Sequence, residues 1–244
     1  MPMRSPLLVP LLLLMSACAS DTEGERVSFQ LMATASGDDA PFATASGWTI
    51  DIQQAEVVLG PVFLFDAEPI ARAPWSSWLV SEAHAHVPTQ AGAVLGEVID
   101  QVRIDLLAAS PALLADVYGQ AGVARSIEVQ LFRAGEVSTA ATGDTVVLAG
   151  QAQREGITIP FEFRWSPDAG APLSITNIAA SLDLTSSGAP VQLSLDLASV
   201  FYNVDLTATE SMTDVMVIET GSEAGQAIAS GLASRGSWSV EVMP

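Results

Sequence analysis

The sequence predicts an all-β protein, a mostly antiparallel β-sandwich with one or two short helices. Apolar and polar residues alternate in many short segments, which is the period of half-buried strands. Turn-forming residues separate these segments, as in a sandwich or barrel. The chain has 244 residues, of which 49% are hydrophobic, and this content excludes a disordered acidic chain as the main body.

The clearest alternation runs from Ile157 to Trp165, where every second residue is large and apolar. Val146 to Ala152 alternate just before it, and Arg154-Glu155-Gly156 lie between the two segments. A glycine-containing turn between alternating segments predicts a β-hairpin. Pro160 indicates an edge position or a bulge, because proline donates no ladder hydrogen bond.

A second hairpin is expected around the turn residues 186–190. Leu182 and Leu184 precede this turn, and Val191 to Leu197 alternate after it. Further strand candidates are Val27 to Ala33, Trp48 to Leu59, Pro61 to Phe65, Val98 to Leu107, Ile127 to Arg133, Val204 to Ala208 and Trp238 to Met243.

One short helix is expected from Ala112 to Tyr118. Ser110 would cap it, Pro111 would occupy its first position and Gly119 would end it. Another turn or two of helix is expected within residues 224–233. The apolar residues between 94 and 102 fit a helical stripe as well as a strand, so both alternatives stay open there.

The N-terminus has the layout of a secretory signal. Arg4 precedes an apolar run from Leu7 to Met15, and small residues follow. The run is too short to span a bilayer, which takes about 20 apolar residues. Met15-Ser16-Ala17-Cys18 resembles the lipobox of bacterial lipoprotein precursors, with Met where that family usually has Leu. The resemblance implies cleavage before Cys18 and lipid on this cysteine, which would hold the protein on a membrane.

The two residues after Cys18 indicate in which membrane such a lipoprotein would reside. Ala19 and Ser20 stand where Asp would favour retention in the inner membrane, so resemblance to the sorting pattern of diderm bacteria implies the outer membrane. The alternative is an ordinary signal peptide followed by a chance cysteine. Cys18 is the only cysteine, so the chain forms no internal disulfide.

These observations divide the chain into three parts. Residues 1–17 form the expected signal peptide, residues 18–25 the lipidated cysteine and a polar tether, and residues 26–244 a single β-sandwich domain. The chain has nine basic and 28 acidic residues, and its formal net charge is −19. This charge repels phosphate backbones, so we expect no nucleic-acid partner, and attachment to an anionic membrane depends on the lipid.

The only two histidines, His84 and His86, are two residues apart, and Glu82 precedes them at the same spacing. On a strand these three side chains would share one face. Two imidazoles and a carboxylate can bind zinc or copper, so they are candidate metal ligands. The alternative is a solvated loop in which the histidines have no such role.

Other functional signals are sparse. The sequence has no His-Glu-x-x-His motif, no Gly-x-Ser-x-Gly elbow and no phosphate loop, so no catalytic residue is predicted. Trp75 and Trp78 are candidates for an exposed surface that stacks on sugars. Trp48, Trp165 and Trp238 lie in strand patterns and are expected in the core.

The body of the chain resembles a family of uncharacterised secreted bacterial β-sandwich lipoproteins over residues 47–130. The similar segments are Gly47 to Ile50, Ala55 to Phe65, Ala83 to His86, Gly96-Glu97 and Asp105 to Leu107. That family has a further histidine shortly after the position of His86, where this chain has Val87-Pro88-Thr89. Asp196 to Phe201 is similar to periplasmic β-sandwich proteins associated with copper peptides.

Together these features predict a lipid-anchored cell-envelope protein with a non-catalytic binding or structural role. Two alternatives stay open. One is divalent metal binding, of copper or zinc, through His84 and His86. The other is a surface sugar-binding module or hydrolase.

Overall fold

The computed structural model describes residues 24–36, 40–69, 92–139, 141–184, 188–207 and 215–243. The strands are β1 (Arg26–Ser36), β2 (Phe42–Ala43), β3 (Thr49–Leu59), β4 (Val62–Phe65), β5 (Val94–Val98), β6 (Val102–Asp105), β7 (Ala112–Gln120), β8 (Gly122–Leu131), β9 (Val146–Arg154), β10 (Ile157–Trp165), β11 (Leu173–Leu184), β12 (Val191–Asp196), β13 (Met216–Ile218) and β14 (Trp238–Val242). Two short α-helices, α1 (Leu197–Phe201) and α2 (Glu223–Ala233), and a 3₁₀ turn, η2 (Arg235–Ser237), complete the described elements. The predicted all-β class is confirmed; one or two short helices were expected and two are present, although only α2 lies where a helix was predicted.

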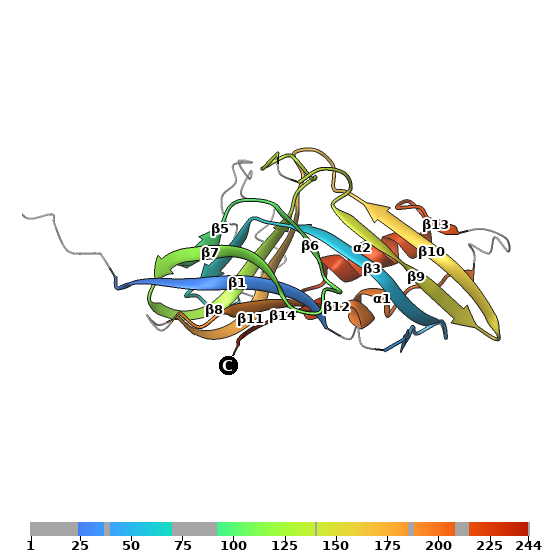
Figure 1. Cartoon of the computed structure of the whole chain (residues 1–244), viewed down its shortest axis with the longest axis horizontal. Coiled ribbons are helices and arrows are strands. Elements are labelled where there is room, and N and C mark those ends of the chain that lie inside the picture. The colour runs from blue at the N-terminus through green and yellow to red at the C-terminus, as the bar shows by residue number, and fades with distance from the viewer. Residues whose placement is uncertain are drawn as a thin grey trace, which may run out of the picture.

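The strands form three sheets. Sheet A has the order β14-β12-β1-β7, sheet B the order β13-β10-β9-β3-β2 with β6 also paired to β3, and sheet C the order β11-β8-β4-β5. Most pairs are antiparallel; β1–β12 and β10–β13 are parallel. Sheets A and C occupy one end of the elongated molecule and meet at their edges, where β5 contacts β7 and β11 contacts β14 (Figure 1).

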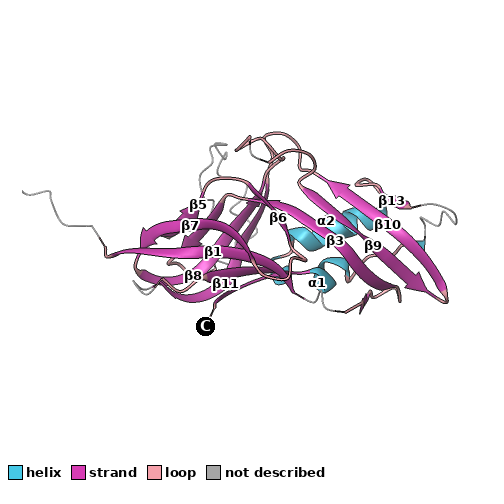
Figure 2. Cartoon of the chain, in the orientation of Figure 1, coloured by secondary structure: helices cyan, strands magenta, loops and turns pink. Residues whose placement is uncertain are grey.

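Sheet B forms the other end, with α1 and α2 on one of its faces (Figure 2). Phe201 of α1 packs against Phe161 of β10 and Phe42 of β2, with ring centroids 5.7 and 6.0 Å apart. One hydrophobic core contains residues of all three sheets and both helices, such as Leu31, Leu64 and Ile228. The sandwich and the helix-covered sheet therefore share one interior.

The hairpin of β9 and β10 is confirmed. Arg154 pairs with Ile157, and the two turn residues Glu155 and Gly156 both have positive φ, 52° and 82°. These angles fit the type I′ turn, whose twist matches that of the strands. Pro160 lies just outside the part of β10 that pairs with β13, so its expected edge position is also confirmed.

The helix expected from Ala112 to Tyr118 is wrong. The segment forms β7, which pairs antiparallel with β1 and buries Leu114 and Val117. Gly119 does not end the segment but lies inside the strand, where a β-carbon would come 2.0 Å from the Leu95 carbonyl oxygen. Long-range pairing thus overrides a helix-like pattern of caps. The open alternative at residues 94–102 is also settled as strand, by β5 and the start of β6.

The second predicted hairpin is wrong as well. β11 pairs with β8 in sheet C, whereas β12 pairs with β1 and β14 in sheet A. Residues 204–207 also form no strand. The remaining strand candidates contain observed strands, although Val98 to Leu107 is strand only at residues 98 and 102–105. The helix expected within residues 224–233 is confirmed as α2, whose Ser222 cap accepts a hydrogen bond from the Gly225 N–H.

The three tryptophans that were expected in the core are buried or half-buried. Trp48 and Trp238 are buried, and Trp165 is half-buried against the core. None of the helices in the described ranges is long and apolar enough to cross a bilayer.

Candidate functional site

A cleft of about 510 Å³ opens where the ends of β1, β5 and β7 come together. Its lining combines Gly24, Arg26 and Val27 with residues 94–97 and 118–120. This volume is within the range of roughly 300–1,000 Å³ that is usual for small-molecule sites. The cleft lies at the seam where an edge of sheet A approaches an edge of sheet C.

The floor of the cleft is apolar and tightly built. Val27 and Leu95 are 4% and 6% exposed, so both side chains belong to the core beneath the opening. Gly119 allows β7 to touch β5, and a β-carbon at Gly96 would lie 3.0 Å from the Phe29 ring. The absence of side chains at these two glycines therefore allows β5, β7 and the Phe29 ring to pack closely beneath the cleft.

The rim of the cleft is polar and carries both signs of charge. It consists of Arg26, Glu97, Tyr118 and Gln120, all solvent-exposed. Arg26 faces Gln120 across the β1–β7 ladder. Tyr118 is 81% exposed, the largest exposed fraction among the exposed large hydrophobic side chains of the described residues. A guanidinium, a carboxylate, a phenol and an amide thus surround an apolar floor.

Backbone groups add hydrogen-bonding capacity. The Ala121 N–H donates to the Glu25 carbonyl oxygen at 2.7 Å, which makes this a hydrogen-bonded pair of the β1–β7 ladder. Such pairs alternate along antiparallel strands. The N–H and C=O groups of Tyr118 and Gln120 therefore point away from β1, toward the cleft side of β7. The cleft can hold the apolar part of a ligand on its floor and a polar part on its rim.

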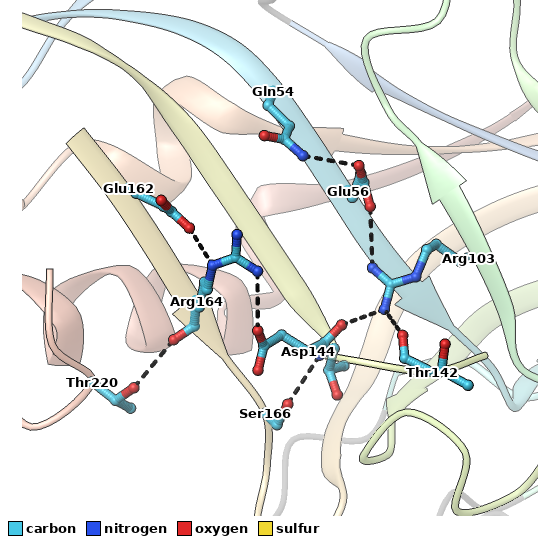
Figure 3. A network of polar contacts seen from close by, with 10 residues as sticks. Gln54, Glu56, Arg103, Thr142, Asp144, Glu162, Arg164, Ser166 and Thr220 are labelled. Atoms are coloured by element: carbon cyan, nitrogen blue, oxygen red, sulfur yellow. Dashed lines mark hydrogen bonds and ion pairs between the residues drawn. The ribbon is translucent and has the colours of Figure 1, made fainter. Parts of the chain in front are cut away.

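A second polar cluster lies on the outer face of sheet B, where two arginines are bonded to three carboxylates (Figure 3). Arg103 donates to Glu56 at 3.2 Å and to the carbonyl oxygens of Thr142 and Asp144 at 2.6 Å each. The Glu56 carboxylate also accepts from the Gln54 amide at 2.9 Å. These contacts attach the connection between β8 and β9 to β3 and β6.

Arg164 continues the same cluster (Figure 3). It donates to Glu162 and, at 3.4 Å, to Asp144. The hydrogen bond to Glu162 is the main reason why the pKa of Arg164 is raised above its ordinary value. Because exposed ion pairs contribute only about 0–1 kcal/mol each, the cluster positions loops more than it stabilises the fold.

The residues singled out by the sequence lie elsewhere. Cys18, Glu82, His84, His86, Trp75 and Trp78 are all outside the described residues. Within the described ranges, no three His, Cys, Asp or Glu side chains are grouped so that they could hold a metal ion.

The cleft was missed by the sequence analysis because its lining comes from three segments far apart in the chain. The one local signal is Tyr118, which belongs to the segment that its capping residues predict as a helix. No protein-family model matches the chain, and no curated protein or solved structure is significantly similar to it.

Proposed function

We propose that the mature chain is a lipid-anchored protein of the outer membrane that binds a small amphipathic ligand, without converting it, in the cleft between β1, β5 and β7. The observation that carries the proposal is the cleft's composition, an apolar floor at Val27 and Leu95 under a rim with both charges. Sites of this size with a few convergent polar groups are the usual form of a small-molecule site.

The anchor is supported by the segment before Cys18. An apolar run followed by Met15-Ser16-Ala17-Cys18 resembles a lipoprotein precursor, and β1 begins at Arg26, close behind this cysteine. Several buried acyl chains, each methylene contributing about 0.8 kcal/mol, hold a protein stably where a single chain does not.

Replacement of the cysteine tests the anchor. The Cys18→Ser chain should incorporate no labelled fatty-acid analogue and should leave the membrane fraction, whereas Ser20→Ala should remain labelled and bound. Equal labelling of Cys18→Ser and the wild type would contradict the anchor.

The two tyrosines of the chain provide a matched test of the cleft. Tyr118 is on the rim, whereas Tyr202 follows α1 and is 58% exposed away from the cleft. We expect Tyr118→Ser to weaken binding of the amphipathic probe anilinonaphthalene sulfonate about tenfold, equivalent to ~1.4 kcal/mol, and Tyr202→Ser to leave it unchanged. Fluorescence titration measures both. Equal effects of the two substitutions would show that the probe binds elsewhere.

A further inference from the structure

The charges on the rim of the cleft are not equally available to a ligand. Glu97 is exposed, and its carboxylate takes part in no hydrogen bond or ion pair within the described part of the chain. Arg26, the other charged residue of the lining, already takes part in an interaction of its own. A carboxylate without a partner forms its strongest contacts with a cation, so the cleft favours a positively charged ligand.

The surroundings of the cleft are acidic as well. Glu25 adjoins Arg26 in the sequence, and Asp116 lies two residues before Tyr118, on the same face of β7. Together with Glu97, these residues place three carboxylates around the single guanidinium of Arg26. The formal net charge of the whole chain, −19, adds a field that attracts cations and repels anions.

The fold brings an aromatic ring to the same seam. A β-carbon at Gly119 would lie 3.2 Å from the Gly96 α-carbon, so these two glycines are in contact between β7 and β5. Tyr118 precedes the first of them and Glu97 follows the second, and both residues line the cleft. The Tyr118 ring is 81% exposed, and the face of an aromatic ring attracts a cation.

The rest of the lining suits a cation with an apolar body. Val27 and Leu95 are buried and provide the apolar floor. Gln120 lies beside Gly24, whose added β-carbon would be 3.7 Å from the amide oxygen of Gln120. This oxygen and the β7 carbonyl groups that point toward the cleft can accept hydrogen bonds from an ammonium group. An inorganic cation would gain nothing from the floor, whereas an organic ammonium contacts both the floor and the rim.

Resting on the function proposed above, we propose that the ligand of the cleft is an organic cation, an ammonium group attached to an aromatic or alkyl body. Glu97 binds the ammonium group, Tyr118 contacts it with the face of its ring, and Val27 and Leu95 contact the apolar body. A neutral or anionic compound of the same shape binds more weakly, because it leaves the Glu97 carboxylate without a partner or is repelled by it.

The test changes only the charge of the ligand. Naphthylmethylamine, naphthylmethanol and naphthylacetate share one aromatic body and are cationic, neutral and anionic at neutral pH. Each is titrated into the full chain by calorimetry. We expect the amine to bind about tenfold more tightly than the alcohol, and the acetate to bind most weakly. Equal binding of the amine and the alcohol would overturn the assignment of a cation.

The Glu97→Gln substitution tests the carboxylate, because it removes the charge and keeps the shape of the side chain. The affinity for the amine should fall about tenfold, to that for the alcohol, while the affinity for the alcohol should stay unchanged. Retained binding of the alcohol also verifies that the cleft of the variant is folded. A preference for the amine that persists in Glu97→Gln would overturn the proposal.

Glu241→Gln is the matched control. Glu241 is exposed and lies on β14, at the opposite edge of sheet A from β7. Its substitution changes the net charge by the same amount as Glu97→Gln, so the preference for the amine should remain. A loss of the same size in this control would show that the field of the whole chain selects the cation, which would overturn the assignment to the cleft.

The outcomes separate the two proposals. Binding of the anilinonaphthalene probe and the naphthyl alcohol without a preference for the amine would overturn the cation and leave the cleft as a ligand site. Failure of this probe and all three naphthyl compounds to bind would overturn the proposed binding function as well.

Discussion

Gln101 organises the connection between β8 and β9 with a single side chain. It is only 2% exposed, and its amide oxygen accepts hydrogen bonds from the backbone N–H groups of Gly135, Val137 and Ser138 at 3.1–3.3 Å. Its amide nitrogen donates to the Arg133 carbonyl oxygen at 3.0 Å. Three backbone N–H groups and one carbonyl oxygen of this part-buried connection, which find no strand partner, are thus bonded by one amide.

Replacing Gln101 by leucine leaves these backbone groups without partners while keeping a side chain of similar size. We expect the free energy of unfolding to fall by about 1–3 kcal/mol, the cost of one unsatisfied buried group, because the exposed residues of the connection can bond to water instead. Urea unfolding measures the change. Gln30→Leu is the control, because Gln30 is exposed and donates to Asp116 at 3.2 Å; it should change stability by less than about 0.5 kcal/mol. Equal losses would contradict the role of Gln101.

Asp205 is the residue whose protonation should affect stability. The hydroxyl of Thr207 donates to its carboxylate at 2.5 Å, and the Thr207 backbone N–H donates at 3.0 Å. These two bonds, the hydroxyl first, hold the pKa of Asp205 below its ordinary value of 3.8. A smaller contribution comes from the buried Trp48 indole N–H, which makes no hydrogen bond of standard geometry within the described part of the chain.

The sign of the pH effect follows from this lowered pKa. The folded state favours the charged carboxylate, so its stabilising contribution is present above pH 3.8 and is lost as the pH falls through the folded pKa. The melting temperatures of the wild type and Asp205→Asn should therefore differ near neutral pH, and the difference should shrink as the pH falls below 3.8. Thr207→Val should behave like Asp205→Asn. A difference that stays constant over this range would contradict the assignment.

At the scale of elements, α1 and α2 pack at a glycine. A β-carbon added at Gly231 of α2 would lie 2.3 Å from the carbonyl oxygen of Val200 in α1. The end of α2 is fixed by two further bonds, from Ser237 to the Gly231 carbonyl oxygen at 2.8 Å and from the Trp238 indole to that of Leu232 at 2.9 Å. The end of α2 is therefore held against η2 and β14, with its glycine face against α1.

Gly231→Ala sets two effects against each other. Alanine favours a helix by up to about 1 kcal/mol over glycine, but overpacking against rigid backbone costs roughly 1–3 kcal/mol. Because the contacting atoms are backbone, we expect the overpacking to dominate and the melting temperature to fall. Gly221→Ala is the control, since nothing lies within 4 Å of its added β-carbon. An increase in stability for Gly231→Ala would show that the two helices can move apart.

Elements set by neighbouring residues could be predicted from the sequence, and elements set by distant partners could not. The β9–β10 hairpin was predictable because its alternation and its Glu155-Gly156 turn are local. β7 was not, because Ser110, Pro111 and Gly119 have the residue types of helix caps, and only pairing with β1 decides the strand.

The pairing partner of β12 could not be predicted from the sequence either. Its parallel pairing with β1 joins segments about 160 residues apart in the sequence. The cleft shares this property, since Arg26, Glu97 and Tyr118 become neighbours only through the fold. Sequence patterns thus identified many of the strands, whereas β7 and the site depended on the pairing of strands that are distant in the sequence.

At the scale of the whole molecule, the chain passes repeatedly between its two ends. β1 lies in sheet A, β3 in sheet B, β4 in sheet C, β7 again in sheet A and β9 again in sheet B. Neither end is built from one continuous piece of chain. A single hydrophobic core runs through both.

This interleaving predicts one cooperative unfolding transition. Neither end can unfold without removing strands and core contacts from the other, so calorimetric and van't Hoff enthalpies should agree. Differential scanning calorimetry measures both, and limited proteolysis should yield no stable half. Two separate transitions would contradict a single domain over residues 26–244.

The place of β1 in sheet A has a mechanical consequence. It is an interior strand, paired with β7 from Arg26 to Ala33 and with β12 from Leu31 to Ser36. A lipid on Cys18 would transmit any pull from the membrane to the N-terminal end of this strand, along its axis. Both ladders would then resist in shear, with many hydrogen bonds sharing the force instead of opening one after another. The strand nearest the proposed anchor is therefore held from both sides against being drawn out of the domain.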